Sequence, residues 1–401
     1  MRRAFTLIEL LIVIAIIAVL AVVVVLTLNP GQLILQARDS TRVSDLASLQ
    51  DAIGLYITDA AVNGTVSLGS VNTVYVSIPD PTATTTLGDQ CQGLGLLSLP
   101  SGYAYHCAAS STFRMNDSTG WIPINFRSMS TGGSLGQLPQ DPINSSSSRT
   151  YETYTTDGSH YEVTAALESQ KYKLGGTNDL VGTDGGTLAT VYEKGTKLGL
   201  EPLDYGDSSL VGLWTFDEGA GTVAYDYSGN GQIGNFQNNP TWVSSGCEIN
   251  GCIDFNGTND KVQVPLSSII SPPGNYTLAT WFNAASTTIG FFVLENGQYG
   301  FEWKGTGSAL QYYDSVYLSS AQTSWSLNTW YYVTMVKSGS AVSLYINGVL
   351  DSIGTGGTHV SSGGLYFGKA LYSFVGMIDD ARLYNRALSA SEIQAMYNGG
   401  K

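Results

Sequence analysis

Residues 5–22 read FTLIELLIVIAIIAVLAV, and this stretch decides how the rest of the chain is interpreted. From Leu10 to Leu26 there are seventeen consecutive residues without a polar side chain, and a glutamate, Glu9, stands immediately before them. A run of this length approaches the roughly twenty apolar residues that a membrane-spanning helix needs. A carboxylate at the edge of such a run is costly and usually has a designated partner, so Glu9 requires a specific explanation.

Three interpretations of residues 1–30 can be compared. A secretory signal peptide needs a basic start, which Arg2 and Arg3 supply, and a small-residue cleavage site after the apolar run, where this chain instead reads TLNPGQ. A plain membrane anchor matches the length of the run but gives no reason for Glu9. In the third interpretation the run is retained and Glu9 has a role in assembly.

The stretch from Ala4 to Leu10 carries the third interpretation, because it resembles the class III signal of type IV pilins and pseudopilins. The resemblance implies that a membrane peptidase removes a leader, residues 1–4, by cutting between Ala4 and Phe5 on the cytoplasmic side of the apolar run. It also implies that the new α-amine of Phe5 is then methylated. The family usually has glycine where this chain has Ala4, and alanine is small enough for the same pocket.

The same resemblance gives residues 5–28 two successive environments. They hold the subunit in the membrane as a transmembrane helix, and they later pack with identical or related helices in the core of a filament. Because a buried carboxylate is tolerable only when it is paired, Glu9 is expected to meet the α-amino group of Phe5 of a neighbouring subunit.

Residues 29–198 are expected to form an amphipathic helix and a pilin-like globular head. Asn29-Pro30-Gly31 interrupts the first helical pattern, and apolar residues then recur at helical spacing, which predicts a second helix from about 32 to 61. Short strand patterns follow, with a hairpin tip at Asp157-Gly158. Their order resembles the sheet and loop segment of pseudopilin heads. The N-terminal part is therefore expected to be α+β, a long N-terminal α-helix with a small antiparallel β head.

The polar stretch 199–209 predicts a short linker, after which the pattern changes. In residues 210–401, apolar and polar side chains alternate between Gly or Asn turns, as is typical of an antiparallel β-sandwich. Asn347-Gly348 predicts a tight hairpin. The segments in this region, CIDFNG and MIDDARLYN among them, resemble in their order a laminin-G-like domain, a concanavalin A-type jelly roll. The chain is therefore expected to end in an all-β jelly-roll sandwich.

Oxygen-bearing side chains cluster near two motifs of this second module. In laminin-G-like domains the first and last strands lie side by side, and many members hold a calcium ion where they meet. The resemblance therefore favours a structural calcium involving Asp226, Asn230 and Asp379, because carboxylate and amide oxygens suit that ion. The alternative is turn chemistry, in which Asp and Asn bond their own backbone and need no ion.

Four aromatic residues fall in loop-rich parts of the same module. An aromatic platform for a sugar ring is one interpretation, and ordinary packing on a sheet face is the favoured one. The four ligand-binding candidates are Trp303, Tyr312, Tyr313 and Trp325.

The four cysteines come as two close pairs, Cys91 with Cys107 and Cys247 with Cys252. Neither pair is a CxxC motif, and no His–Cys cluster with zinc spacing accompanies them. Two local disulfides in an oxidising compartment are therefore expected, with four buried thiols as the alternative.

Composition and motifs argue against two classes of protein. A formal net charge of −14 argues against a nucleic-acid partner, which would require a basic face. Hydrolases on this sandwich use carboxylates at an even spacing along one strand, a pattern that this sequence lacks. Asp379 and Asp380 are adjacent, which would place them on opposite sides of a strand. No enzymatic activity is expected.

These features predict a structural subunit of a type IV pilus-like filament that displays the laminin-G-like domain for adhesion or carbohydrate binding. The alternative is a pseudopilin of the type II secretion type, with a protein-contacting or spacer sandwich. The expected partners are related pilin subunits, the prepilin peptidase, the pilus assembly machinery and a polysaccharide or host or cell-surface ligand. The expected location is the inner (cytoplasmic) membrane before assembly, and then an extracellular filament on the surface of a prokaryotic cell.

Overall fold

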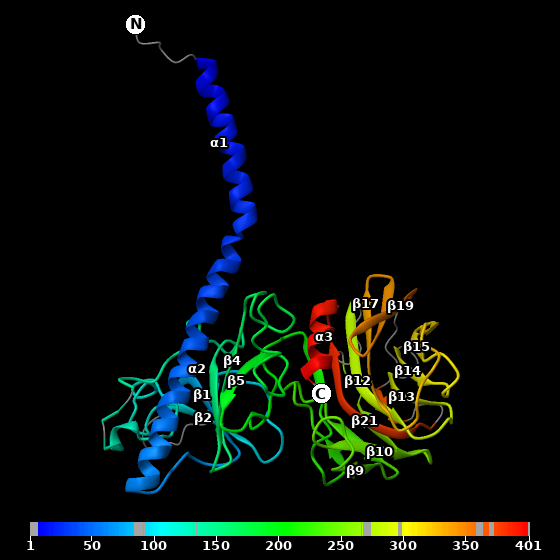
Figure 1. Ribbon diagram of the computed structural model, residues 1–401. Coiled ribbons are helices and arrows are strands. Elements are labelled where there is room, and N and C mark those ends of the chain that lie inside the picture. Colours follow the sequence, from blue (N-terminus) through cyan, green and yellow to red (C-terminus); the bar gives the residue numbers. More distant parts are fainter. Residues whose placement is uncertain are drawn as a thin grey trace.

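The computed structural model describes residues 7–83, 91, 93–130, 132–133, 135–265, 267, 274–295, 299–357, 364–368 and 373–399, with the backbone alone for 21–28, 63 and 294–295. A helical stem leads into two β-rich domains that lie side by side, and the C-terminal helix lies between them (Figure 1). The N-terminal end of the stem points away from both domains.

Two helices, α1 (Leu7–Leu28) and α2 (Pro30–Asn63), form the stem. Asn29 separates them in a left-handed conformation, with φ of 40°, and its side chain accepts a hydrogen bond from the backbone amide of Gln32. Pro30 stands at the first turn of α2, where a missing N–H breaks no helical hydrogen bond. The predicted interruption is confirmed, and α2 is slightly longer than the range 32–61.

The head contains a five-stranded sheet in the described part of the chain, with the order β2-β1-β3-β4-β5. Strands β1 and β2 are parallel and the other neighbours are antiparallel, so the sheet is mixed where the sequence predicts an antiparallel one. Apolar residues of α2, such as Leu46, Leu49 and Ile53, pack with Trp121 in the head core. The elements are β1 (Thr73–Asp80), β2 (Ala104–Ala109), the 3-10 helix η1 (Phe126–Ser128), β3 (Glu152–Thr156), β4 (Tyr161–Ala166) and β5 (Val191–Gly195).

The second domain is an antiparallel sandwich of two eight-stranded sheets, counted over the described residues. The first sheet has the order β19-β18-β17-β12-β21-β10-β9, and β6 also pairs with β21. The first and last strands of the domain are therefore neighbours, as the resemblance implies. The strands are β6 (Leu210–Trp214), β9 (Thr241–Val243), β10 (Cys252–Asn256), β12 (Tyr276–Ala284), β17 (Trp330–Ser338), β18 (Ala341–Ile346), β19 (Val349–Thr355) and β21 (Val375–Tyr384).

The second sheet has the order β16-β15-β14-β13-β20-β11-β8-β7. Its inner face and that of the first sheet enclose an aromatic core, in which the rings of Phe282 and Phe292 stack with centroids 4.4 Å apart. The strands are β7 (Val223–Ala224), β8 (Gly234–Gln237), β11 (Lys261–Val264), β13 (Gly290–Glu295), β14 (Tyr299–Trp303), β15 (Gln311–Asp314), β16 (Tyr317–Ser319) and β20 (Leu365–Phe367).

The predicted hairpin between β18 and β19 is confirmed. Ile346 pairs with Val349, and the two residues between them, Asn347 and Gly348, have φ values of 51° and 77°. Positive φ at both central positions defines the type of two-residue turn that matches the twist of antiparallel strands, and Asn-Gly adopts it at the lowest cost.

The segment 199–209 is not a solvent-exposed linker. Glu201, Leu203, Asp204 and Tyr205 are at most 4% exposed. The Asp204 carboxylate accepts hydrogen bonds from the backbone amides of Ala189 (3.0 Å) and Thr190 (2.8 Å). The segment still connects the two domains, but its polar groups find partners in distant parts of the chain, which a local pattern does not reveal.

Apolar contacts also join the two domains. The C-terminal helix α3 (Ala390–Gly399) buries Ile393 and Met396 in a cluster that includes Leu210 of β6 and Ala189 of the head. The head backbone approaches the start of α3 so closely that a Cβ added at Gly175 would lie 2.5 Å from the amide nitrogen of Glu392. The head and the sandwich therefore share a continuous apolar interface, which opposes independent motion of the two domains.

Candidate functional site

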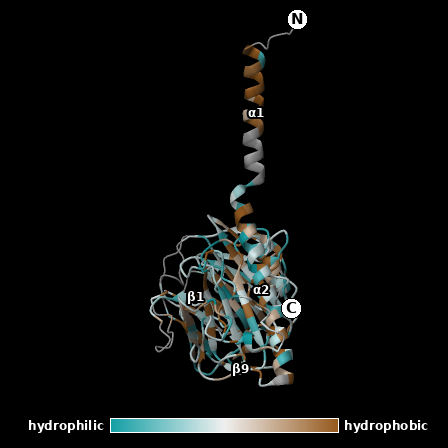
Figure 2. Cartoon of the chain, turned by 90° about the vertical axis from the view of Figure 1, so that its left-hand side faces the viewer, coloured by the Kyte–Doolittle hydropathy of each residue, from teal (hydrophilic) through white to brown (hydrophobic). Residues whose placement is uncertain are grey.

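The first candidate site is the exposed apolar surface of α1. Figure 2 shows that the part of α1 with described side chains is almost entirely hydrophobic. Its large apolar side chains are between 44% and 80% exposed, and isolated soluble proteins rarely present an apolar surface of this extent. These side chains are Leu7, Ile8, Leu10, Leu11, Ile12, Val13, Ile14, Ile16, Ile17, Val19 and Leu20.

Glu9 lies on this apolar surface, in the first turn of α1, and is exposed. A carboxylate in this position is also favourable for the helix itself, because it faces the positive end of the helix dipole. Ala4 and Phe5, the predicted processing residues, lie outside the described residues. Within the described part of the chain, no helix is both long enough and apolar enough to cross a membrane.

Both predicted disulfides are present. Cys91 is bonded to Cys107 in the head, with their Cα atoms 5.3 Å apart, and Cys247 is bonded to Cys252 in the sandwich, at 5.5 Å. Each bond closes a loop next to a strand, β2 in the first case and β10 in the second. The alternative of buried thiols is therefore wrong.

Three of the four aromatic candidates belong to the core and not to a sugar platform. Trp303 and Tyr312 are each 1% exposed and Trp325 is 5% exposed, and the two indole N–H groups donate to backbone carbonyl oxygens. The platform interpretation is wrong for them: alternation along β14 and β15 turns the rings of Trp303 and Tyr312 inward, and Trp325 packs against Trp303 from the loop before β17. Tyr313 is only partly buried and lies against Tyr317, an exposed residue of β16, with ring centroids 4.8 Å apart.

The predicted calcium residues make different contacts in the structure. Asp226 accepts hydrogen bonds from the backbone amides of Leu213 (3.0 Å) and Ser228 (2.9 Å) through Oδ1 and from Gln232 (2.8 Å) through Oδ2. The Asn230 amide donates to the carbonyl oxygen of Leu210 at 2.9 Å. These bonds fasten the turn at 226–232 to β6, which supports the turn-chemistry alternative for Asp226 and Asn230.

Asp379 makes its hydrogen bonds to a different segment, residues 248–249. Its Oδ2 accepts from the backbone amides of Glu248 (3.2 Å) and Ile249 (2.9 Å), and its Oδ1 is buried without a hydrogen-bond partner. No group of three or more His, Cys, Asp or Glu side chains that could hold a metal ion occurs among the residues that the structure describes. Asp226 and Asn230 thus bond within one turn and to β6, Asp379 bonds another loop, and a calcium ion shared by the three stays a prediction.

Asp379 and Asp380 line one cavity, although adjacent strand residues ordinarily point to opposite faces. The pairing of β21 with β12 shifts between Ala279 and Trp281, so that Thr280 faces two residues, and Asp380 adopts φ of 43°. This is a β-bulge, which turns the second carboxylate toward the side of the first. The prediction of opposite faces was wrong because a bulge breaks the period of two.

We call this cavity the acidic cleft; it lies between the head and the sandwich and has a volume of about 400 Å³. Tyr103, Lys197 and Glu201 line it from the head side. The sandwich contributes Tyr227, Asn250, Arg382 and the three carboxylates Asp217, Asp379 and Asp380. The cleft thus combines phenol, amide and carboxyl groups from segments far apart in the sequence.

Burial changes the charge state of the cleft. Loss of solvent, and then the neighbouring carboxylates Asp380 and Asp217, raise the pKa of Asp379 to about 9, against the hydrogen bonds from Ile249 and Glu248. Burial likewise raises the pKa of Glu201 to about 8. Arg382 pairs with Asp380 at 3.0 Å and with Asp204 at 3.4 Å, so its charge is already neutralised by carboxylates from both sides of the interface.

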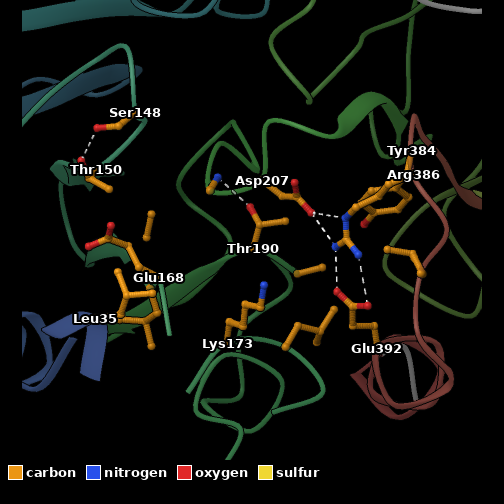
Figure 3. A pocket seen from close by; sticks show the side chains of 16 residues that line it. Leu35, Ser148, Thr150, Glu168, Lys173, Thr190, Asp207, Tyr384, Arg386 and Glu392 are labelled. Atoms are coloured by element: carbon orange, nitrogen blue, oxygen red, sulfur yellow. Dashed lines mark hydrogen bonds and ion pairs between the residues drawn. The ribbon is translucent and has the colours of Figure 1, made fainter. Parts of the chain in front are cut away.

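A second interdomain cavity, of about 340 Å³, is lined by α2, the head and the end of the sandwich. Figure 3 shows Arg386 bridging two carboxylates, Asp207 and Glu392, at 2.7 Å each, while Lys173 points into the space between them and Glu168. Arg386 therefore clamps α3 to the segment 199–209. The charged groups of Arg386, Asp207 and Glu392 on the wall of this cavity therefore pair with one another and have a structural role.

The comparison with family models matches two parts of the chain. Residues 1–25 match the prokaryotic N-terminal methylation motif, and residues 256–394 match the concanavalin A-like lectin/glucanases superfamily. The chain joins a pilin-type N-terminus to a concanavalin A-like domain. The methylation motif covers most of α1, and the concanavalin A-like match covers most of the sandwich, from the last residue of β10 to the middle of α3.

Two solved structures that resemble this chain each match about half of it, and no curated protein matches. Domain 4 of AbnA, an arabinanase of Geobacillus stearothermophilus, is 19% identical with a TM-score of 0.39, covering 47% of this chain and 98% of that domain. A Trypanosoma rangeli sialidase is 18% identical with a TM-score of 0.39, and the match covers 48% of this chain and 32% of that one. At these values neither likeness says anything about function.

Proposed function

We propose that this chain is a structural subunit of a type IV pilus-like filament that displays its β-sandwich for adhesion or carbohydrate binding. In this proposal prepilin peptidase cuts between Ala4 and Phe5, and the retained helix first anchors the subunit in the membrane. The observation that carries the proposal is a methylation motif at the head of a helix whose apolar side chains are exposed.

The exposed helix requires an apolar environment, which either lipid or other helices can provide. Burying a Leu, Ile or Val side chain contributes roughly 1.5–3 kcal/mol, and α1 carries a continuous series of them. In lipid these side chains are already in an apolar solvent, so association between helices depends on close packing and on polar pairs. Pairing of Glu9 with the α-amino group of a neighbouring subunit would supply such a polar pair.

The position of the sandwich supports display. Both β-rich domains lie at the end of the stem opposite to the N-terminus (Figure 1), so helices packed through α1 would leave the domains outside the core. The shared interface between head and sandwich would then hold each sandwich in a fixed orientation to the filament. This arrangement suits a module that must meet a polysaccharide or cell surface.

A protein-contacting role, as in a secretion pseudopilus, is the second candidate. It is favoured by exposed apolar side chains on β16 and β19, each of which is one edge of its sheet. Among these side chains are Tyr317, Val349 and Ile353. Edge strands with exposed apolar residues are common sites of contact with another protein.

Replacing Glu9 with alanine is expected to leave the chain in the membrane and to lower its amount in filaments at least tenfold. The physical reason is the loss of the only carboxylate on the apolar surface of α1 that could pair with a neighbour's amine. The measurement is the ratio of chain in sheared filaments to chain in the membrane fraction. Asp51→Ala, which removes an exposed carboxylate of α2, is the control and should assemble like the original chain. Equal assembly of Glu9→Ala would contradict the proposal.

A further inference from the structure

We propose that the acidic cleft between head and sandwich binds a saccharide that carries free amino groups. The inference rests on the proposed function and deepens it, because it gives the displayed module a ligand class and a site. It places that site at the junction of the two domains, and not on an open sheet face of the sandwich.

The first observation is a polar atom without a partner. Asp379 is fully buried and lines the cleft, and its Oδ1 accepts no hydrogen bond, while Oδ2 accepts two from the backbone. Leaving a buried carboxyl oxygen without a partner costs about 1–3 kcal/mol, and more if the group is charged. A ligand that donates a hydrogen bond to Oδ1 recovers that cost.

The second observation is the charge balance of the cleft. The two cations on its walls are already engaged, because Arg382 pairs with Asp380 and Asp204, and Lys197 pairs with Asp157 at 3.1 Å. Asp217 and Asp379 have no cation partner in the described part of the chain, and each takes backbone amides instead. An ammonium group forms charge-assisted hydrogen bonds with an ionised carboxylate such as Asp217, and its charge favours ionisation of the buried carboxyl of Asp379, whereas an acidic ligand would disfavour it.

The third observation is the chemistry of the remaining walls. Tyr103 from the head and Tyr227 from the sandwich are partly exposed, and Thr215 and Asn250 add a hydroxyl and an amide. Aromatic rings offer a face to the C–H side of a sugar, and amide and hydroxyl groups bond its hydroxyls. The volume of about 400 Å³ lies within the roughly 300–1,000 Å³ of ordinary ligand sites.

The test compares two probes of the same length and linkage, a β-1,4-linked glucosamine tetramer and its fully N-acetylated counterpart. Binding to the full chain in detergent is measured by titration calorimetry at pH 6. The glucosamine tetramer is expected to bind at least tenfold more tightly than the acetylated one. Asp217→Asn and Asp379→Asn are each expected to weaken its binding at least fivefold. Asp217 supplies a carboxylate to an ammonium group, and an ammonium group beside Asp379 favours the ionised form of that carboxyl, which then releases its proton to solvent.

Two further variants separate the cleft from the rest of the molecule. Tyr103→Ala, on the head side, should also weaken binding at least threefold, whereas Asp51→Asn, an exposed carboxylate of α2, should leave it unchanged. Because Asp379 is buried and its replacement could disturb folding, the partly exposed pair Asp217 and Tyr103 decides the outcome if Asp379→Asn fails to fold.

Failure of this inference can be told from failure of the proposed function. Equal affinity for the two tetramers, no binding of either, or binding that survives Asp217→Asn and Tyr103→Ala would overturn the cleft assignment. None of these results bears on filament assembly, which the Glu9→Ala experiment measures separately. Absence of the unmutated chain from filaments would instead overturn the proposed function, whatever the cleft binds.

Discussion

Replacing Arg42 with alanine is expected to lower the free energy of unfolding of the chain by about 3–5 kcal/mol. Arg42 lies on α2 with its side chain fully buried, and three carboxylates surround it. Its guanidinium meets Asp39 at 2.9 Å and Glu168 at 2.7 Å, and it binds Asp141 through two nitrogens. Among the described residues, Asp39 and Asp141 have no other cation partner, so removing Arg42 leaves two buried carboxylates unpaired.

The pKa of Arg42 supports the same conclusion. Burial alone would lower it, but hydrogen bonds and charge from Asp141 and Glu168 raise it above its ordinary value. Asp39 in turn accepts the backbone amides of Glu168 (2.9 Å) and Ser169 (2.8 Å), so the network ties α2 to the loop after β4. The stem and the head are therefore expected to loosen together when Arg42 is lost.

Arg38 provides the matched control, one turn earlier on α2. It pairs with Glu168 at 2.8 Å, but both side chains are more than a fifth exposed, so Arg38→Ala is expected to cost less than about 1 kcal/mol. Urea denaturation followed by circular dichroism measures both variants. A change below 1 kcal/mol for Arg42→Ala, or equal changes for the two variants, would show that the network does not hold the head together.

The melting temperature of the chain is expected to fall as the pH rises from about 5 to about 9. Burial raises the pKa of Asp379 from 3.8 to about 9, that of Glu201 from 4.5 to about 8 and that of Glu218 from 4.5 to about 7. Each group binds its proton more tightly when folded than when unfolded. Its stabilising contribution is complete below the unfolded pKa and is lost as the pH rises through the folded pKa.

The opposite sign holds for Asp207 and Glu392, the partners of Arg386. Burial raises their pKa values, but hydrogen bonds to Arg386 outweigh burial and lower the pKa of each carboxylate, so their contribution is lost as the pH falls below about 4. Stability is therefore expected to be greatest near pH 4–5 and to decrease steadily toward pH 8.

Glu201→Gln tests the origin of this pH dependence, because it removes a fully buried titrating group and keeps its size. Differential scanning calorimetry between pH 4 and pH 9 should give a shallower slope for this variant than for the original chain. A melting temperature that is constant or rises over this range would contradict the assignment of neutral, buried carboxyl groups.

Local chemistry made much of the fold predictable from the sequence. Pro30 and Asn347-Gly348 each restrict the backbone strongly, so the helix break and the hairpin could be placed to the residue. The alternation of the second module predicted the sandwich, and the spacing of the cysteines predicted both disulfides. The helix break, the hairpin, the strands and the disulfides all depend on residues that are close in the sequence, and a sequence pattern records such local relations.

The acidic cleft could not be predicted, because it depends on contacts between distant segments. Asp379 and Asp380 reach the same side only through a bulge opposite Thr280, and no signal in the sequence marks that bulge. Tyr103 and Asp217 meet only when the two domains dock. The polar residues of 199–209 predicted a linker, and nothing local in the sequence shows that Asp204 is buried against partners in β21 and in the loop before β5.

The most direct test of the central claim is the mass of the mature N-terminus, determined by mass spectrometry on chain purified from its native host. A filament subunit of the pilin type is expected to begin at Phe5, to carry one methyl group on its α-amine and to retain the whole apolar run. A chain that still begins at Met1, or one that has lost residues 5–28 to a signal peptidase, would contradict the account.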